Sequence, residues 1–129
     1  MGGRGTYATG RKVTPTYQTV GHINGVPVLQ PDASRHGTLP EEAHSSNAYI
    51  LLDSSGEFKM YREYDTQHNL RIEIAYHYET ALVPRATGRI LHIHEYDPTT
   101  FKRTPARLLT ECEYRRYKPY FKGELKWKK

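Results

Sequence analysis

The side chains best suited to chemistry lie in two segments, LRIEIAYH (70–77) and RILHIHEY (89–96), in which apolar and polar residues alternate. Alternation with a period of two is typical of a β-strand with one buried face, and it places every second side chain on the same side. If the two strands are neighbours, their polar side chains share one face of a sheet. That polar set is Arg71, Glu73, His77, His92, His94 and Tyr96.

Two histidines on one face could cleave RNA without a metal ion. A neutral imidazole would remove the proton of the 2′-hydroxyl, and a protonated imidazole would donate a proton to the leaving 5′-oxygen. Both forms are available because the ordinary pKa of histidine lies close to neutrality. We expect His77 with His92 or His94 in these roles and no cofactor. Arg71 and Tyr96 would stabilise charge on the phosphate.

The same residues admit a second interpretation, a zinc site. His77, His92 and His94 would supply three nitrogen ligands, and Glu73 would be a fourth ligand or a base beside the metal. Three protein ligands with one open position is the arrangement of catalytic zinc. A third interpretation is an exposed sheet face that simply accommodates polar residues. The alternation alone does not choose among the three.

Positive charge is concentrated near the C-terminus. Residues 101–129 carry ten Lys or Arg and three Glu, whereas the chain as a whole has a net charge of only +5. This asymmetry favours a polyanionic partner, and we expect nucleic acid, RNA in particular. Interleaved aromatic side chains could stack on bases. The candidate nucleic-acid-binding residues are Arg115, Arg116, Lys118, Tyr120, Lys122, Lys126 and Trp127.

The elements that must position these residues form a single α+β domain. Short segments of strand character between turn signals, at 48–53, 57–64, 70–77 and 89–96, predict an antiparallel sheet of about four strands. Ahead of them, the Asn24-Gly25 pair predicts a tight turn between two short extended pieces.

A helix should follow the last strand and pack on one face of the sheet. Thr104 and Pro105 are of the types preferred at an N-cap and at the first helical position, so we expect a helix over 105–118. Leu108, Leu109 and Cys112 would begin its apolar stripe.

Alternation also predicts which strand residues share a side. Leu70, Ile72, Ile74 and Tyr76 should lie on one side of their strand. Phe58, Met60, Arg62 and Tyr64 should share one side of theirs.

The chain is expected to comprise a flexible Gly-rich arm over 1–19, one domain over 20–121 and a basic tail over 122–129. One cysteine excludes an internal disulfide and favours a reducing compartment. No run of residues approaches the roughly 18 apolar positions that a membrane helix requires. We therefore expect a cytoplasmic protein that does not associate with membranes.

Four segments in order, LPEEAHSSNAYILLD, KMYREYD, RIEIAYH and RILHIHEYD, resemble a type of small domain encoded by phages and integrated elements of bacteria. Such domains follow a Gly-rich linker at the C-terminus of Mu-F-like minor head proteins, where toxin domains are carried. The resemblance implies the barnase–EndoU–colicin–RelE ribonuclease layout, a helix against a four-stranded antiparallel sheet that cuts RNA with His, Arg or Lys, and Tyr. It further implies a bacterial host cytoplasm and a host or immunity protein as a second partner.

A function of another class fits the same chain. The protein would then be a non-enzymatic phage accessory module, or an inhibitor of a host nucleic-acid enzyme. It would bind through its basic, Tyr-rich C-terminus, and the histidines would be ordinary polar residues of the sheet.

Overall fold

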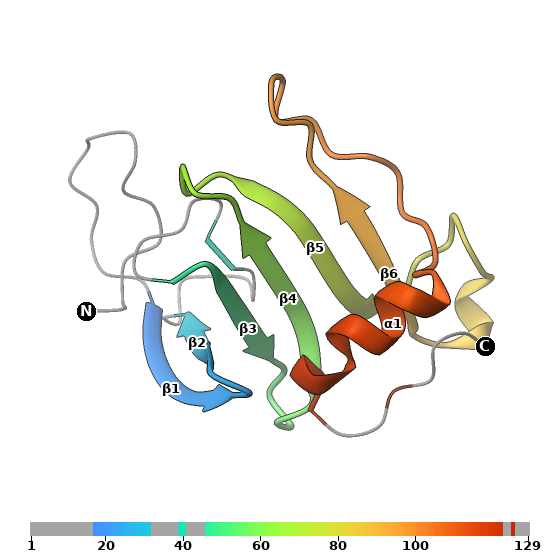
Figure 1. The fold of residues 1–129 in the computed structure, drawn as a ribbon. Helices are drawn as coiled ribbons and strands as arrows, with labels where there is room; N and C mark the ends of the chain where they lie inside the picture. Colours follow the sequence, from blue (N-terminus) through green and yellow to red (C-terminus); the bar gives the residue numbers. More distant parts are fainter. Residues whose placement is uncertain (1–16, 32–38, 41–45, 123–124, 126–129) are drawn as a thin grey trace.

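The fold, seen in a computed structural model, is of the α+β class (Figure 1). The structure describes residues 17–31, 39–40, 46–122 and 125. Six strands form one sheet in the order β1-β2-β3-β4-β5-β6. Their bounds are Tyr17–Ile23 (β1), Val26–Pro31 (β2), Ala48–Leu52 (β3), Phe58–Tyr64 (β4), Leu70–His77 (β5) and Ile90–Glu95 (β6). The helical elements are η1 (Arg85–Thr87), α1 (Glu111–Tyr117) and η2 (Lys118–Tyr120).

The sheet is mixed, so the prediction of about four antiparallel strands is only partly right. β3 to β6 form the predicted antiparallel array, but β1 and β2 add a hairpin whose second strand runs parallel to β3. The hairpin turns at Asn24 and Gly25, whose φ angles of 49° and 84° are those of a tight turn between twisted strands. Residues 17–19, predicted as part of the arm, belong to β1. The remainder of that arm, 1–16, lies outside the described residues.

The helix is shorter than predicted and begins later. Residues 105–110 are not helical, and α1 starts after Thr110, whose hydroxyl accepts a hydrogen bond from the backbone N–H of Glu113. The predicted start at Thr104 is wrong because residues around Arg103 and Arg107 form antiparallel bridges to Tyr96 and Ile93 instead. Cys112 is consequently exposed and Leu108 is 36% exposed, so the predicted apolar stripe is also wrong there.

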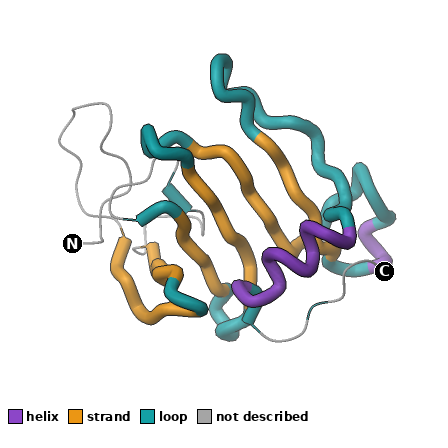
Figure 2. The backbone as a smooth tube through the Cα atoms, in the orientation of Figure 1, coloured by secondary structure: helices purple, strands orange, loops and turns teal. Residues whose placement is uncertain are grey.

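The sheet separates two hydrophobic clusters, one on each of its faces. On the face that α1 crosses in Figure 2, sheet side chains pack with residues of the C-terminal segment. We call this the helix face; its buried residues are Val28, Ala48, Ile50, Phe58, Tyr61, Ile74, Leu91, Ile93, Leu109, Tyr117 and Phe121. We call the opposite face the histidine face. Its apolar cluster comprises Tyr17, Leu29, Leu39, Tyr49, Leu51, Met60, Tyr64 and Leu70, with Tyr96 packed against it.

Two irregularities in strand pairing change the predicted sides of two residues. Leu51 pairs with Met60 but Leu52 pairs with Phe58, so one extra residue of β4 turns Phe58 onto the helix face. The register shifts again between Glu63 and Tyr64, and Leu70 joins the cluster of the histidine face instead of facing α1. The remaining apolar residues of β5 keep their predicted side.

Within the described ranges, no helix is long and apolar enough to cross a membrane.

Candidate functional site

The histidine face is built from cross-strand rows of side chains over β3 to β6. In one row, Arg62 of β4 pairs with Glu73 of β5, which pairs with His94 of β6. In the next row, Ala75 of β5 pairs with His92 of β6. Paired residues of antiparallel strands point to the same side of a sheet. The structure therefore brings Glu73, His92 and His94 together as the alternation predicted.

A buried polar network occupies the first row. Glu73 Oε1 accepts hydrogen bonds from Arg62 Nη2 at 2.8 Å, Arg62 Nε at 3.2 Å and Tyr96 Oη at 3.1 Å. Arg62 Nη1 donates to the carbonyl oxygens of Leu39 at 2.7 Å and Pro40 at 3.2 Å. The network fixes the segment around residue 39 on this face. Arg62, absent from the candidate set, is thus the arginine that pairs with Glu73.

Charge pairing inside the network controls both ionisations. Burial works against the charged carboxylate of Glu73, but the guanidinium of Arg62 outweighs it and lowers the pKa of Glu73. Burial likewise opposes the charge of Arg62, and Glu73 raises its pKa in return. Burial raises the pKa of the Tyr96 phenol. The network is thus a neutralised ion pair with a neutral phenol donor at pH 7.

Arg71 is not part of this arrangement. Its guanidinium lies 2.6 Å from a carboxylate oxygen of Asp65, in the turn between β4 and β5. It also donates to the backbone carbonyl of Tyr96 at 3.5 Å. The predicted role of Arg71 at the histidines is therefore not supported by its position.

The three histidines form a row of rings. The centroids of His77 and His92 are 4.9 Å apart, and those of His92 and His94 are 5.4 Å apart, each pair in edge contact. His92 is 0% exposed and His94 is 4% exposed, whereas His77, at the end of β5, is half-buried. Only His77 thus has a ring that a large ligand could reach without displacing protein atoms.

His92 has one ring nitrogen bonded and one left without a partner. Its Nδ1 lies 2.9 Å from the carbonyl oxygen of Ile90. Its Nε2 is buried and has no hydrogen-bond partner in the part of the chain that the structure describes. Of the described carboxylates, Glu79 comes nearest, with Oε1 3.9 Å away and beyond hydrogen-bond reach. Burial lowers the pKa of His92, so the ring is neutral at pH 7 and forms no ion pair with Glu79.

Glu79 is a residue that the sequence did not indicate. It lies in the loop after β5, where no alternation assigns a side to it, and its side chain is 24% exposed. Its proximity to His92 depends on how that loop folds back over the sheet. In the sequence, Pro84 and Gly88 predict a loop in this segment but not the direction of its side chains.

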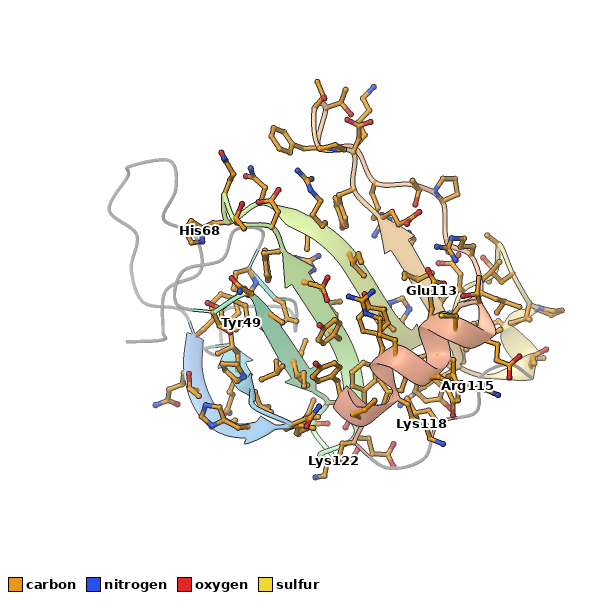
Figure 3. The ribbon with its side chains drawn as sticks, viewed as in Figure 1. Tyr49, His68, Glu113, Arg115, Lys118 and Lys122 are labelled. Carbon is orange, nitrogen blue, oxygen red and sulfur yellow. The ribbon has the colours of Figure 1, made fainter. Side chains whose placement is uncertain are left out.

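A second candidate surface lies at the C-terminal end of α1. Lys118 and Lys122 sit along the lower edge of the molecule below the helix (Figure 3). Together with Arg115 and Arg116 they are exposed. Arg115 pairs with Glu111 of the same helix. For the part of the chain that the structure describes, no carboxylate pairs with the other three cations. We call Arg116, Lys118 and Lys122 the basic surface.

Aromatic rings adjoin these cations. The guanidinium of Arg116 lies 5.4 Å from the ring centroid of Tyr117, and Nζ of Lys118 lies 5.6 Å from that of Tyr114. Tyr120 stacks on Tyr61 at 5.0 Å, so one face of its ring is already covered. Of the predicted binding residues, Lys126 and Trp127 lie outside the described ranges.

No protein-family model matches the chain, and no curated protein or solved structure matches it either.

Proposed function

We propose that the protein is an RNA-binding domain that holds single-stranded RNA at the basic surface. The observation that carries the proposal is the set of three exposed cations, Arg116, Lys118 and Lys122, with no described carboxylate partner. Both acidic residues of α1 are already engaged, Glu111 with Arg115 and Glu113 with Arg107. Among the described residues, no carboxylate cancels the positive charge of these three cations, which is then available to phosphates.

Single-stranded RNA fits this surface better than a duplex. The partly exposed ring of Tyr120, between Lys118 and Lys122, offers a plane on which an unstacked base can lie, as single strands and loops allow. Tyr120 exposes at most one ring face because Tyr61 covers the other. A base can thus stack on it from one side only.

The geometry gives less support to metal-free cleavage by the histidines. A general acid or base has to touch the group with which it exchanges a proton. His92 and His94 are almost completely buried, and the neutral ring of His92 is a poor acid. We therefore propose RNA binding, without cleavage by these two imidazoles.

The test is binding of a short fluorescent single-stranded RNA over a series of salt concentrations. We expect the variant Arg116→Gln/Lys118→Gln/Lys122→Gln to bind at least tenfold more weakly than the wild type at about 0.1 M salt. Each lost phosphate contact should reduce the slope of log K against log salt by about 0.7, so the slope should fall by about 2.

The matched control is Arg85→Gln/Lys102→Gln/Arg103→Gln, which removes the same charge from exposed positions elsewhere. The 97–102 loop that ends at Lys102 projects at the top of Figure 1, away from the C-terminal end of α1. An equal loss of affinity in both triple variants would mean that net charge alone governs binding. That result, or wild-type protein that fails to bind RNA, would refute the proposal.

A further inference from the structure

Three potential metal ligands from two parts of the chain converge beside β6. One ligand atom each of Glu79, His92 and His94 lies within 4.8 Å of the other two. The two histidines are two residues apart on one strand, and the glutamate comes from the loop after β5. His77, whose ring contacts His92, does not belong to this group. The ligand set therefore differs from the one that the alternation predicted.

Both histidines present the same nitrogen to this point. Nδ1 of His92 faces the carbonyl of Ile90 at 2.9 Å, and Nδ1 of His94 faces the carbonyl of Thr104 at 2.8 Å. A carbonyl oxygen can only accept, so in each neutral ring Nδ1 carries the hydrogen and Nε2 has the free lone pair. A backbone carbonyl that fixes the tautomer in this way is the usual companion of a metal-bound histidine.

The free lone pair of His92 has no hydrogen-bond donor among the residues that the structure describes. Nε2 is buried and has no partner among the described residues, whereas buried polar atoms in proteins nearly always have one. The carboxylate oxygen Oε1 of Glu79, 3.9 Å away, is an acceptor like Nε2 and cannot supply a hydrogen. A metal cation between these two acceptors, which lie 3.9 Å apart, would satisfy both lone pairs.

We propose that Glu79, His92 and His94 bind one divalent transition-metal ion, with Zn²⁺ as the best match. Two imidazoles and one carboxylate are a ligand set that zinc accepts, and they leave one coordination position for water or another ligand. This site is independent of RNA binding at the basic surface and goes beyond it.

The spacing requires only a modest closure. Bonds of about 2.0–2.1 Å place the ligand atoms of a tetrahedral zinc ion about 3.3 Å apart. The pair at 3.9 Å must therefore approach by roughly half an ångström, and a pair at the 4.8 Å limit of the group by about 1.5 Å. Glu79 can move because it lies in a loop and is partly exposed, whereas the two histidines are held by their strand. The partly exposed carboxylate also marks the side from which an ion enters.

The experiment measures metal binding by the full chain after treatment with a chelator. Wild-type protein is titrated with Zn²⁺ alone, followed by calorimetry and by elemental analysis of the gel-filtered product. We expect one equivalent bound. Glu79→Gln keeps the shape of the side chain and removes its charge. It should weaken Zn²⁺ binding by more than about 100-fold, because the loss of a residue that only supports a metal ligand already costs about 10–100-fold. His92→Ala should abolish it, with circular dichroism to confirm that the variant is folded.

Matched controls separate this ligand set from its neighbours. Glu57→Gln removes an exposed carboxylate, and His77→Ala removes the adjacent ring; both should bind Zn²⁺ as the wild type does. Co²⁺ in place of Zn²⁺ should give visible absorption without a thiolate band, because Cys112 lies outside the group.

Less than stoichiometric Zn²⁺ in the wild type would refute the site. So would unchanged binding in Glu79→Gln, or loss of binding in His77→Ala. If His92→Ala is unfolded, the comparison of Glu79→Gln with Glu57→Gln decides alone.

Discussion

The most costly single side chain to remove should be Arg62. Its guanidinium is buried, neutralises Glu73 and holds two backbone carbonyls of the 39–40 segment. Removing one partner of a buried ion pair leaves the other charge uncompensated, which costs about 3–5 kcal/mol. We therefore expect Arg62→Met to lower the free energy of unfolding by about that amount, measured by urea denaturation.

The double variant Arg62→Met/Glu73→Leu tests the reason for that loss. With both charges gone, no ion remains buried without a partner, so the double variant should be more stable than Arg62→Met alone. The carbonyls of Leu39 and Pro40 would still lose their donor, and wild-type stability is not expected to return. If the loss of unfolding free energy in the double variant equals the sum of the losses in the two single variants, Arg62 and Glu73 are not coupled.

Alternation was sufficient to place Glu73, His92 and His94 on one face, because consecutive side chains of a regular strand must point to opposite sides. It was insufficient for Arg71, which lies at a shift in register and turns to Asp65 instead. It could not assign Glu79, since a loop residue has no period from which to read a direction. The side on which a residue lies can be predicted for a regular strand. It cannot be predicted for loop residues such as Glu79, which complete the proposed site.

The start of α1 illustrates a similar competition between local signals. Thr104-Pro105 and Thr110 with Glu113 are both valid helix-start patterns. The second is used because the backbone of Arg107 exchanges two hydrogen bonds with that of Ile93, which holds the intervening chain extended beside β6. Such pairing depends on tertiary contacts and has no signal in the segment itself. The parallel pairing of β2 with β3 likewise depends on the path of the chain between the two strands.

Glu113 should make stability depend on pH at the acid end. Hydrogen bonds from Arg107, 2.9 Å to each carboxylate oxygen, are the main reason that its pKa falls from the ordinary 4.5 to about 2. The folded state thus has the lower pKa. Its stabilising contribution is complete above pH 4.5 and is lost as the pH falls towards 2.

Glu113→Gln isolates that charge because glutamine can still complete the helix cap. We expect the variant to lose about 1–2 kcal/mol at neutral pH, a value reduced by solvent screening at this partly exposed side chain. Between pH 4.5 and about 2, its unfolding free energy should fall less steeply than that of the wild type. Parallel curves for the two proteins in urea denaturation at several pH values would contradict this account.

The sheet divides the molecule into two surfaces with different chemistry. The helix face carries α1 and the exposed cations that follow it, and the histidine face carries the proposed ion site. Strands β4, β5 and β6 of the sheet lie between the two surfaces. Ile74 and Ile93 point to the helix face, and Glu73 and His94 point to the histidine face. Among the described residues, polar contacts connect the two surfaces around the edge of β6: His94 contacts Thr104, Thr104 contacts Glu95, and Arg107 pairs with both Glu95 and Glu113 of α1. Because the sheet lies between the two proposed sites, we expect their ligands to bind largely separately.

Separate action can be measured directly as a coupling between the two ligands. RNA affinity should change by less than about fivefold, the lower end of ordinary allosteric coupling, when Zn²⁺ is added to the wild type. Glu79→Gln should bind RNA like the wild type, and Arg116→Gln/Lys118→Gln/Lys122→Gln should bind Zn²⁺ like the wild type. Because coupling is reciprocal, a larger effect of Zn²⁺ on RNA binding must appear as an equal effect of RNA on Zn²⁺ binding. A coupling larger than about fivefold would contradict separate action of the two proposed sites.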